Sequence, residues 1–174
     1  MKKYKLGMYL GRFQPFHNGH KAIVDQMLKE CKEVVVVIGS PQVQDEIKNP
    51  YFAWERVNMI KLCYPDTPNL HIICLPDRDK EYISNDSSWG DYVFEYLRHF
   101  GFVPDAIYQG FETERKSWWI SCNGSKPDLI VVSRVNIPIS GTLVRSALLE
   151  KNWSFVRECL PDPVFIYLST WRRV

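Results

Sequence analysis

Apolar residues recur along the chain with two different spacings, which predicts strands that alternate with helices. Short apolar runs predict five strands, at residues 6–10, 34–38, 70–75, 106–109 and 129–132. Apolar positions three or four residues apart predict helices over residues 22–31, 53–62 and 89–100. This alternation is typical of parallel βαβ units.

The second of these runs, residues 34–38, contains only β-branched residues. A continuous run of this kind is typical of a central parallel strand buried on both faces, so we expect it beside the first strand. The pattern therefore predicts an α/β fold with a doubly wound parallel sheet. In such a sheet the ligand crevice lies at the carboxyl ends of the strands, where the strand order reverses. We expect the loops at residues 11–20, 39–40 and 76–79 to meet there.

Composition limits the class of protein. A chain of 174 residues that is 45% hydrophobic and 24% charged suits one domain with a real core. A net charge of +2 without a lysine or arginine run favours small anionic substrates over nucleic acid. The five scattered cysteines indicate reduced core residues, and no apolar run resembles a membrane span or signal peptide, so we expect a cytoplasmic protein. The aromatic content of 14% suggests apolar contact surface and hence a homo-oligomer.

Two histidines three positions apart, His17 and His20, stand in a loop between the first strand and the first helix. Backbone N–H groups at a helix N-terminus favour an anion, and Arg12 adds a charged donor. We therefore interpret the loop at residues 11–20 as a phosphate site. Two other interpretations stay open, because a histidine pair could ligate zinc or could only cap the helix. Zinc is disfavoured because the chain has four histidines in all and no Cys-x-x-Cys motif.

A second pattern, at residues 139–145, also suits an anion. Ser140 or Thr142 can cap the helix that follows, and Arg145 lies one turn into it. The triphosphate of a nucleotide fits such a helix start. Taken alone, the same residues also describe an ordinary capped surface helix with a solvated arginine.

Both patterns resemble known signatures. Residues 11–20, GRFQPFHNGH, resemble the first signature of the nucleotidylyltransferase superfamily, Gly-x-Phe-x-Pro-x-His-x-Gly-His, and residues 139–145, ISGTLVR, resemble its second, Ile-Ser-x-Thr-x-x-Arg. The chain particularly resembles nicotinamide mononucleotide adenylyltransferases of the archaeal type and their bifunctional bacterial relatives. The resemblance implies a single Rossmann-like nucleotidylyltransferase domain over residues 1–174, with a C-terminal helical segment over residues 141–174.

The same resemblance implies a reaction and its residues. AMP passes from ATP to nicotinamide mononucleotide, which yields NAD and pyrophosphate, and Mg²⁺ accompanies ATP as cofactor. The implied catalytic residues are Arg12, His17, His20 and Arg145. The residues implied for ATP binding are Gly11, Arg12, Phe13, His17, His20, Ser140, Gly141, Thr142 and Arg145. Those implied for the mononucleotide are Gly39, Ser40, Arg56, Asp79, Asn85 and Trp89, and no residue is assigned to a metal.

Two of the mononucleotide residues have a plainer interpretation that stays open. Arg56 could form a surface ion pair with Glu55 or Asp45. Trp89 lies on an apolar helical stripe, which is typical of a core residue.

Other functions would keep both signatures. A relative that acts on pantetheine phosphate, flavin mononucleotide or a cytidylyl acceptor would not need Asn85 and Trp89 as a nicotinamide pocket. A nucleotide-sensing regulator would bind the same ligands without turnover. An RNA-binding fragment related to class I synthetases would need a basic face, which the sequence does not show. The expected partners are ATP and nicotinamide mononucleotide, with no nucleic acid and no membrane.

Overall fold

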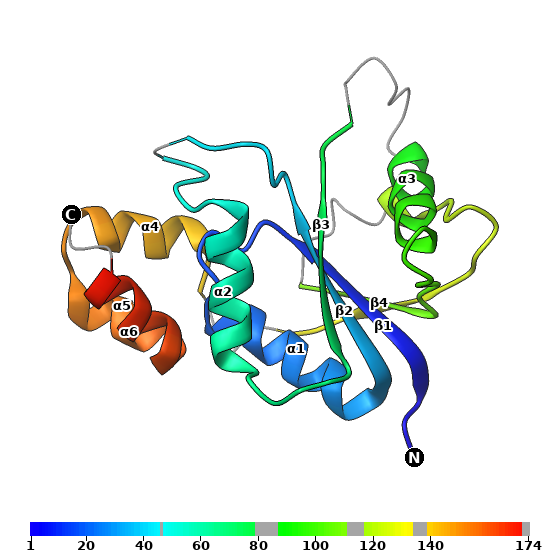
Figure 1. Ribbon diagram of the computed structural model, residues 1–174, viewed down its shortest axis with the longest axis horizontal. Coiled ribbons are helices and arrows are strands. Elements are labelled where there is room, and N and C mark those ends of the chain that lie inside the picture. Colours follow the sequence, from blue (N-terminus) through cyan, green and yellow to red (C-terminus); the bar gives the residue numbers. More distant parts are fainter. Residues whose placement is uncertain (46, 79–86, 111–116, 134–138, 172–174) are drawn as a thin grey trace.

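The five predicted strands form one parallel sheet in the computed structural model (Figure 1). The structure describes residues 1–45, 47–78, 87–110, 117–133 and 139–171. The strands are β1 (Tyr4–Gly11), β2 (Cys31–Gly39), β3 (Leu70–Leu75), β4 (Ala106–Gln109) and β5 (Asp128–Val131). Their order across the sheet is β3-β2-β1-β4-β5.

Helices cover both faces of this sheet. They are α1 (Asn18–Glu30), α2 (Ala53–Cys63), α3 (Ser87–Arg98), α4 (Gly141–Leu149), α5 (Trp153–Cys159) and α6 (Asp162–Trp171). Figure 1 shows α3 on one side of the sheet, and α1, α2 and the three C-terminal helices on the other. None of the helices in the described ranges has both the length and the apolar character needed to cross a bilayer. The predicted Rossmann-like, doubly wound fold is confirmed.

The central strand β2 is buried on both faces, which explains its uninterrupted apolar run. Val34, Val36 and Ile38 belong to the core beneath α1 and α2. Val35 and Val37 belong to the core beneath α3. Because successive side chains of a strand point to opposite faces, such a strand needs an apolar residue at every position.

The strand order reverses between β1 and β4. Tyr9 of β1 lies beside Val36 of β2 on one side and beside Tyr108 of β4 on the other. Since the strands are parallel, the chain leaves β1, β2, β3 and β4 at the same edge of the sheet. This edge, at the carboxyl ends of β1 and β4, is where such a sheet is expected to bind its ligand.

The first helix begins four residues earlier and ends one residue earlier than its apolar spacing predicts. It ends at Glu30, and Cys31, which fits the helical spacing, is the first residue of β2. Cys31 is fully buried, lies beside Tyr4 of β1, and is within 3.5 Å of the hydroxyl of Tyr108. A core position in a strand and a core position on a helix both require an apolar side chain. Apolar spacing alone therefore misplaces the boundary between α1 and β2.

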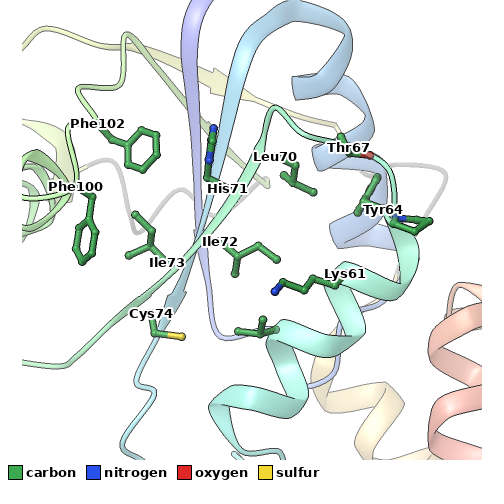
Figure 2. A pocket seen from close by; sticks show the side chains of 12 residues that line it. Lys61, Tyr64, Thr67, Leu70, His71, Ile72, Ile73, Cys74, Phe100 and Phe102 are labelled. Carbon is green, nitrogen blue, oxygen red and sulfur yellow. The ribbon is translucent and has the colours of Figure 1, made fainter.

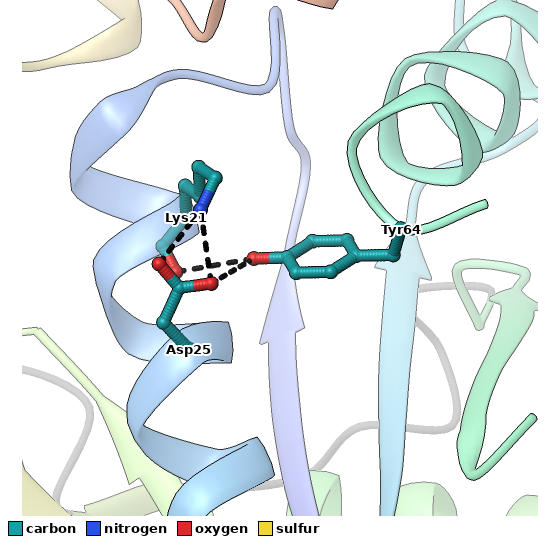
Figure 3. Close-up of polar contacts among 3 residues, drawn as sticks. All are labelled: Lys21, Asp25 and Tyr64. Carbon is teal, nitrogen blue, oxygen red and sulfur yellow. Dashed lines mark hydrogen bonds and ion pairs between the residues drawn. The ribbon is translucent and has the colours of Figure 1, made fainter. Parts of the chain in front are cut away.

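A polar contact links the end of α2 to α1 (Figure 3). The hydroxyl of Tyr64 donates to the carboxylate of Asp25 at 2.8 Å, and the ammonium of Lys21 lies 2.8 Å from the same carboxylate. Burial, followed by the bond to Asp25, raises the pKa of Tyr64, so its hydroxyl stays protonated and continues to donate. This contact fixes the position of the first turns of α1 relative to α2.

Candidate functional site

Gln14 holds the loop between β1 and α1 in one shape. Its side-chain amide donates to the carbonyl of Tyr51 at 2.9 Å, and its side-chain oxygen accepts from the N–H of Tyr51 at 3.0 Å. The backbone enters the left-handed region at Phe13, where φ is 53°. The ring of Phe13 lies over Gly11, where an added Cβ would come within 2.9 Å of it. A side chain at position 11 would therefore force the ring of Phe13 to move.

His17 and His20 lie against each other at the start of α1. Their ring centroids are 3.6 Å apart and their planes are inclined by 22°. Nδ1 of His20 accepts the backbone N–H of His17 at 3.3 Å, so a neutral His20 carries its proton on Nε2. The rings of Phe13 and Phe16 pack on His20, with centroid distances of 4.9 Å and 5.8 Å. This packing orients an imidazole donor at a helix N-terminus, where a phosphate is favoured.

The helix α4 begins with a capping residue, as the second signature predicts. Oγ of Ser140 accepts from the N–H of Leu143 at 3.2 Å, so Ser140 is the cap. Thr142 has a different role, because its Oγ1 accepts from Nη2 of Arg145 at 3.2 Å. The alternative that the sequence leaves between the two hydroxyls is thus resolved in favour of Ser140.

Arg145 connects the second signature to the first. Its Nη1 donates to the backbone carbonyl of Gln14 at 2.8 Å, and its Nε donates to the carbonyl of Ile47 at 2.8 Å. Gly141 permits this approach, since an added Cβ would lie 3.0 Å from Nη1 of Arg145 and 3.1 Å from the carbonyl oxygen of Gln14. The start of α4 therefore lies directly against the loop after β1.

Three arginines concentrate positive charge around this loop. Arg12 is exposed and lies 3.5 Å from the side-chain oxygen of Asn49. Burial, and next the charge of Arg12, lower the pKa of Arg145. Burial is also the main cause that lowers the pKa of Arg56, and the charge of Arg12 lowers it further. An anion bound among these guanidinium groups would relieve their mutual repulsion.

Arg56 is fully buried and forms no surface ion pair in the part of the chain that the structure describes. Its guanidinium donates to the carbonyls of Arg12, Gly39 and Ser40 at 3.0 Å, 2.9 Å and 3.1 Å. Glu55, the alternative partner, instead accepts the N–H of Phe52 at 2.9 Å. Arg56 thus joins the loops after β1 and β2, and its predicted contact with a substrate phosphate stays a prediction.

The described residues predicted for the mononucleotide lie at the end of β2, on α2 (Arg56) and on α3 (Trp89). Gly39 is the last residue of β2 and Ser40 follows it, and the hydroxyl of Ser40 donates to Asp77 at 2.9 Å, which places the loop after β3 beside them. Asp79 and Asn85 lie outside the described residues.

Trp89 lies in the first turn of α3, on the other face of the sheet. Its ring packs against Tyr92 and Trp118, with centroid distances of 5.5 Å and 5.9 Å. Trp89 is partly buried against the core beneath α3. The interpretation of Trp89 as a core residue therefore holds for the buried part of its side chain. Its indole nitrogen is buried and has no hydrogen-bond partner among the described residues. Such a donor is available to a ligand.

Within the described ranges no cluster of three or more histidines, cysteines or acidic residues could hold a metal ion. The donors gathered at the loop are imidazole, guanidinium and backbone N–H groups, which suit oxygen anions. The arrangement is therefore able to bind phosphates and to stabilise charge that develops on them.

Sequence reasoning gave no role to Gln14, Tyr51 and Asn49, although they shape the site. Gln14 lies inside the first signature, and Asn49 directly precedes Pro50. Their contacts join residues 37 positions apart, which no local pattern reveals. The one local signal is that Gln14 is a polar residue between the apolar residues Phe13, Pro15 and Phe16.

A hollow with a volume of about 810 Å³ lies over the edge strand β3, away from the loop that follows β1 (Figure 2). Figure 2 shows that its lining comes from both faces of the strand, with Ile72 and Cys74 on the side of Lys61 and Tyr64, and with His71 near Phe102. None of the predicted site residues lines it.

Known proteins resemble the chain over almost its whole length. A family model described as cytidylyltransferase-like matches residues 8–147. A nicotinamide-nucleotide adenylyltransferase of Saccharolobus solfataricus is 30% identical over 168 residues, which cover 93% of this chain and 88% of that protein. The protein of the same name from Thermococcus sibiricus is 34% identical over 170 residues, which cover 94% of this chain and 82% of that protein. The nicotinamide-nucleotide adenylyltransferase of Methanocorpusculum labreanum is 52% identical over only 54 residues. These residues are 31% of this chain and 32% of that protein.

A solved structure shares the fold. A bifunctional NMN adenylyltransferase/ADP ribose pyrophosphatase from Francisella tularensis, complexed with AMP and a manganese ion, superposes with a TM-score of 0.69 and 23% identity. The match covers 98% of this chain, which spans about half (50%) of the length of that protein.

Proposed function

The chain belongs to the cytidylyltransferase-like family, and to the nicotinamide-nucleotide adenylyltransferases within it, and from this premise we propose that it transfers AMP from ATP to nicotinamide mononucleotide, forming NAD and pyrophosphate. The observation that carries the proposal is the contact between its two signatures, in which Arg145 donates to the carbonyl of Gln14 at 2.8 Å. This contact joins the imidazole pair to the start of α4 in one cationic, donor-rich site.

The reaction needs no protein nucleophile. The 5′-phosphate of the mononucleotide attacks the α-phosphorus of ATP in line, the new P–O bond forms, and the bond to the leaving pyrophosphate breaks. Negative charge then spreads over the α-phosphate oxygens and the pyrophosphate. Donors that are already fixed before the reaction lower the barrier by stabilising this charge.

We assign the α-phosphate to His17 and His20. The stacked rings and the bond from the His17 backbone to Nδ1 of His20 direct the proton of a neutral His20 to Nε2. An imidazole that is packed on several sides loses little freedom when it donates to the transition state. Gly11 and Phe13 support the loop that carries the pair.

We assign the β- and γ-phosphates to Arg12 and Arg145 and to the N-terminus of α4. The cap at Ser140 leaves further N–H groups of the first turn, at Gly141 and Thr142, for phosphate oxygens. Arg12 is exposed and therefore reaches an entering triphosphate with little rearrangement.

We place the mononucleotide between the loop after β2 and the start of α3. Arg56 fixes the backbone of Gly39 and Ser40, and Trp89 offers a partly exposed aromatic ring to a cationic pyridinium. Roles for Asp79 and Asn85 in the same pocket remain part of this proposal.

A divalent ion enters the proposal with the substrate. The Francisella protein is complexed with a manganese ion, but the donors of this site do not form a carboxylate cluster in the described ranges. We therefore expect Mg²⁺ to be carried by the phosphates of ATP, and we assign it no protein ligand. A cytoplasmic location, supported by five free thiols, and self-association also remain proposals.

An acceptor panel tests the proposal. The purified chain is incubated with ATP, Mg²⁺ and, in turn, nicotinamide mononucleotide, flavin mononucleotide and 4′-phosphopantetheine, and pyrophosphate release is followed. We expect release only with the pyridine mononucleotide. Release with another acceptor would overturn the assigned substrate, and binding without any release would favour a nucleotide sensor.

A further inference from the structure

The strand β3 lies at an edge of the sheet and lacks the features that keep other strands away from such an edge. The strand order leaves one side of β3 without a neighbour in the sheet. Natural edge strands are commonly protected by a lysine, a proline or a bulge. The sequence of β3, LHIICL, contains no lysine, proline or acidic residue, and its register with β2 is uninterrupted from Leu70 to Leu75. An edge of this kind favours pairing with a further strand.

The hollow of about 810 Å³ lies along this edge and is lined from both faces of the strand (Figure 2). Ile72 and Cys74, both half-buried, line it on the side of α2. On the side of α3 the lining includes His71 and Phe102, whose ring centroids are 4.9 Å apart, and the exposed Phe100. Because successive side chains of a strand point to opposite faces, a hollow that reaches both faces fits an added strand.

The backbone groups of β3 that point away from β2 belong to Leu70, Ile72 and Cys74. The carbonyl of Asn69 accepts from the N–H of Val34 of β2 at 2.9 Å, so the backbone of Asn69 points toward β2. This direction alternates from one residue to the next along a strand. The even-numbered residues of β3 therefore present their N–H and C=O groups to the open side.

Some of these outward groups are already bonded within the chain. The N–H of Leu70 donates to the carbonyl of Thr67 at 3.1 Å, and the hydroxyl of Tyr96 donates to the carbonyl of Cys74 at 3.0 Å. The others have no hydrogen-bond partner among the described residues. They are the carbonyl of Leu70, both groups of Ile72 and the N–H of Cys74. This arrangement is the same when it is read in either direction from Ile72, with donors and acceptors exchanged.

We propose that β3 is a contact between two copies of this chain, which pair antiparallel about a two-fold axis with Ile72 opposite Ile72 of the second copy. Residues directly opposite each other in such a pair can exchange both N–H···O bonds, so the two Ile72 residues satisfy each other. In the same register Leu70 lies opposite Cys74 of the second copy. The carbonyl of Leu70 then accepts the N–H of that Cys74, and each outward group without a partner finds one.

A second copy fits this edge better than an unrelated extended peptide. The N–H of Leu70 and the carbonyl of Cys74 are already bonded, so a peptide of unrelated sequence would place its own backbone groups opposite them without a partner there. In the two-fold pair these two bonded groups face each other, and neither is left unsatisfied. The same register places His71 opposite Ile73 of the second copy, so no like charges meet on β3.

This pairing is independent of the reaction proposed for the loop after β1. None of the residues assigned to that reaction lines the hollow. Failure of the chain to form NAD would therefore leave the pairing standing, and a monomeric chain would leave the reaction standing.

Sedimentation equilibrium of the purified chain and of two charge variants tests the pairing. We expect the wild type to be at least dimeric. Ile72→Lys and Ile72→Glu each place like charges opposite each other at the two-fold axis, so each variant alone should have half the mass of the wild type. A mixture of the two variants places unlike charges there and should regain the wild-type mass. The matched control is Val131→Lys on the other edge strand, β5, where Val131 is also exposed, and its mass should equal that of the wild type.

Amide hydrogen exchange of the wild type tests the same contact without a substitution, and it decides the matter if a charged variant does not fold by circular dichroism. We expect the N–H groups of Ile72 and Cys74 to exchange slowly in the associated protein and faster on dilution. The proposal is overturned if the wild type is monomeric, if folded Ile72→Lys keeps the wild-type mass, or if the mixture stays at half of it. Fast exchange of both N–H groups in the associated protein would also overturn it.

Discussion

Nη1 of Arg145 donates to the backbone carbonyl of Gln14 at 2.8 Å, across 131 positions of sequence. Gln14 is in turn paired with the backbone of Tyr51 through both atoms of its side-chain amide. The loop after β1, the segment before α2 and the start of α4 are therefore one connected unit. Substitutions of His20, Arg145 and Arg56 each perturb one part of this unit.

His20→Ala removes the imidazole that we assign to the α-phosphate. Loss of one donor to the transition state costs about 3 kcal/mol, so we expect kcat to fall a hundredfold or more. The measurement is the rate of NAD formation at saturating substrates, with folding checked by circular dichroism. His71→Ala is the control. His71 lies on β3, away from the loop after β1, and its Nε2 is 2.8 Å from the carboxylate of Glu33 on β2. Near-normal turnover of a folded His20→Ala protein would refute the assignment.

Arg145→Lys keeps the charge but cannot serve the carbonyls of Gln14 and Ile47 and a phosphate together. We expect the KM for ATP to rise about tenfold, with a smaller effect on the KM for the mononucleotide. Steady-state kinetics with each substrate varied in turn provide the measurement. Arg157→Lys is the control, since Arg157 is exposed and lies 3.8 Å from its partner Asp162. An equal rise in both KM values would argue against an ATP-specific role.

Arg56→Met removes the donor to three backbone carbonyls while preserving most of the side-chain volume. Buried carbonyls without partners are costly, so we expect the free energy of unfolding to fall by about 3 kcal/mol. Urea denaturation measures this change. Because Arg56 positions Gly39 and Ser40, the KM for the mononucleotide should also rise more than the KM for ATP. Unchanged stability would show that the carbonyls find other donors.

Gly90→Ala tests the close packing of α3, since the added Cβ would lie 2.2 Å from the carbonyl oxygen of Ser121 and 2.3 Å from that of Trp118. We expect the free energy of unfolding to fall by about 2 kcal/mol, although alanine favours a helix more than glycine does. In the control Gly39→Ala, the nearest atom is at an ordinary 3.7 Å, and the unfolding free energy should change little. Equal stability of both variants would contradict the tight contact at Gly90.

The sheet could be predicted because its signals are local. The strands β3 and β4 begin and end at the residues that the apolar runs predict, and β5 begins one residue earlier. The predicted boundary between α1 and β2 was wrong, because the buried Cys31 meets the apolar requirement of a helix and of a strand equally well. Such a boundary depends on hydrogen bonds to the neighbouring strand, which apolar spacing does not encode.

The site could be predicted only as far as its motifs extend. The signatures pointed to His17, His20 and Arg145 as candidates, and the preference of helices for hydroxyl caps narrowed the cap of α4 to Ser140 or Thr142, of which the structure has Ser140. The burial of Arg56 could not be anticipated, because a surface ion pair is the usual environment of a helical arginine.

The most direct test of adenylyl transfer follows the α-phosphorus of ATP. The purified chain is incubated with nicotinamide mononucleotide, Mg²⁺ and ATP that carries radioactive phosphorus at the α position, and the products are separated. We expect the label to appear in NAD, with one pyrophosphate released for each NAD formed. Label that remains in ATP or leaves as free AMP, without labelled NAD, would contradict it.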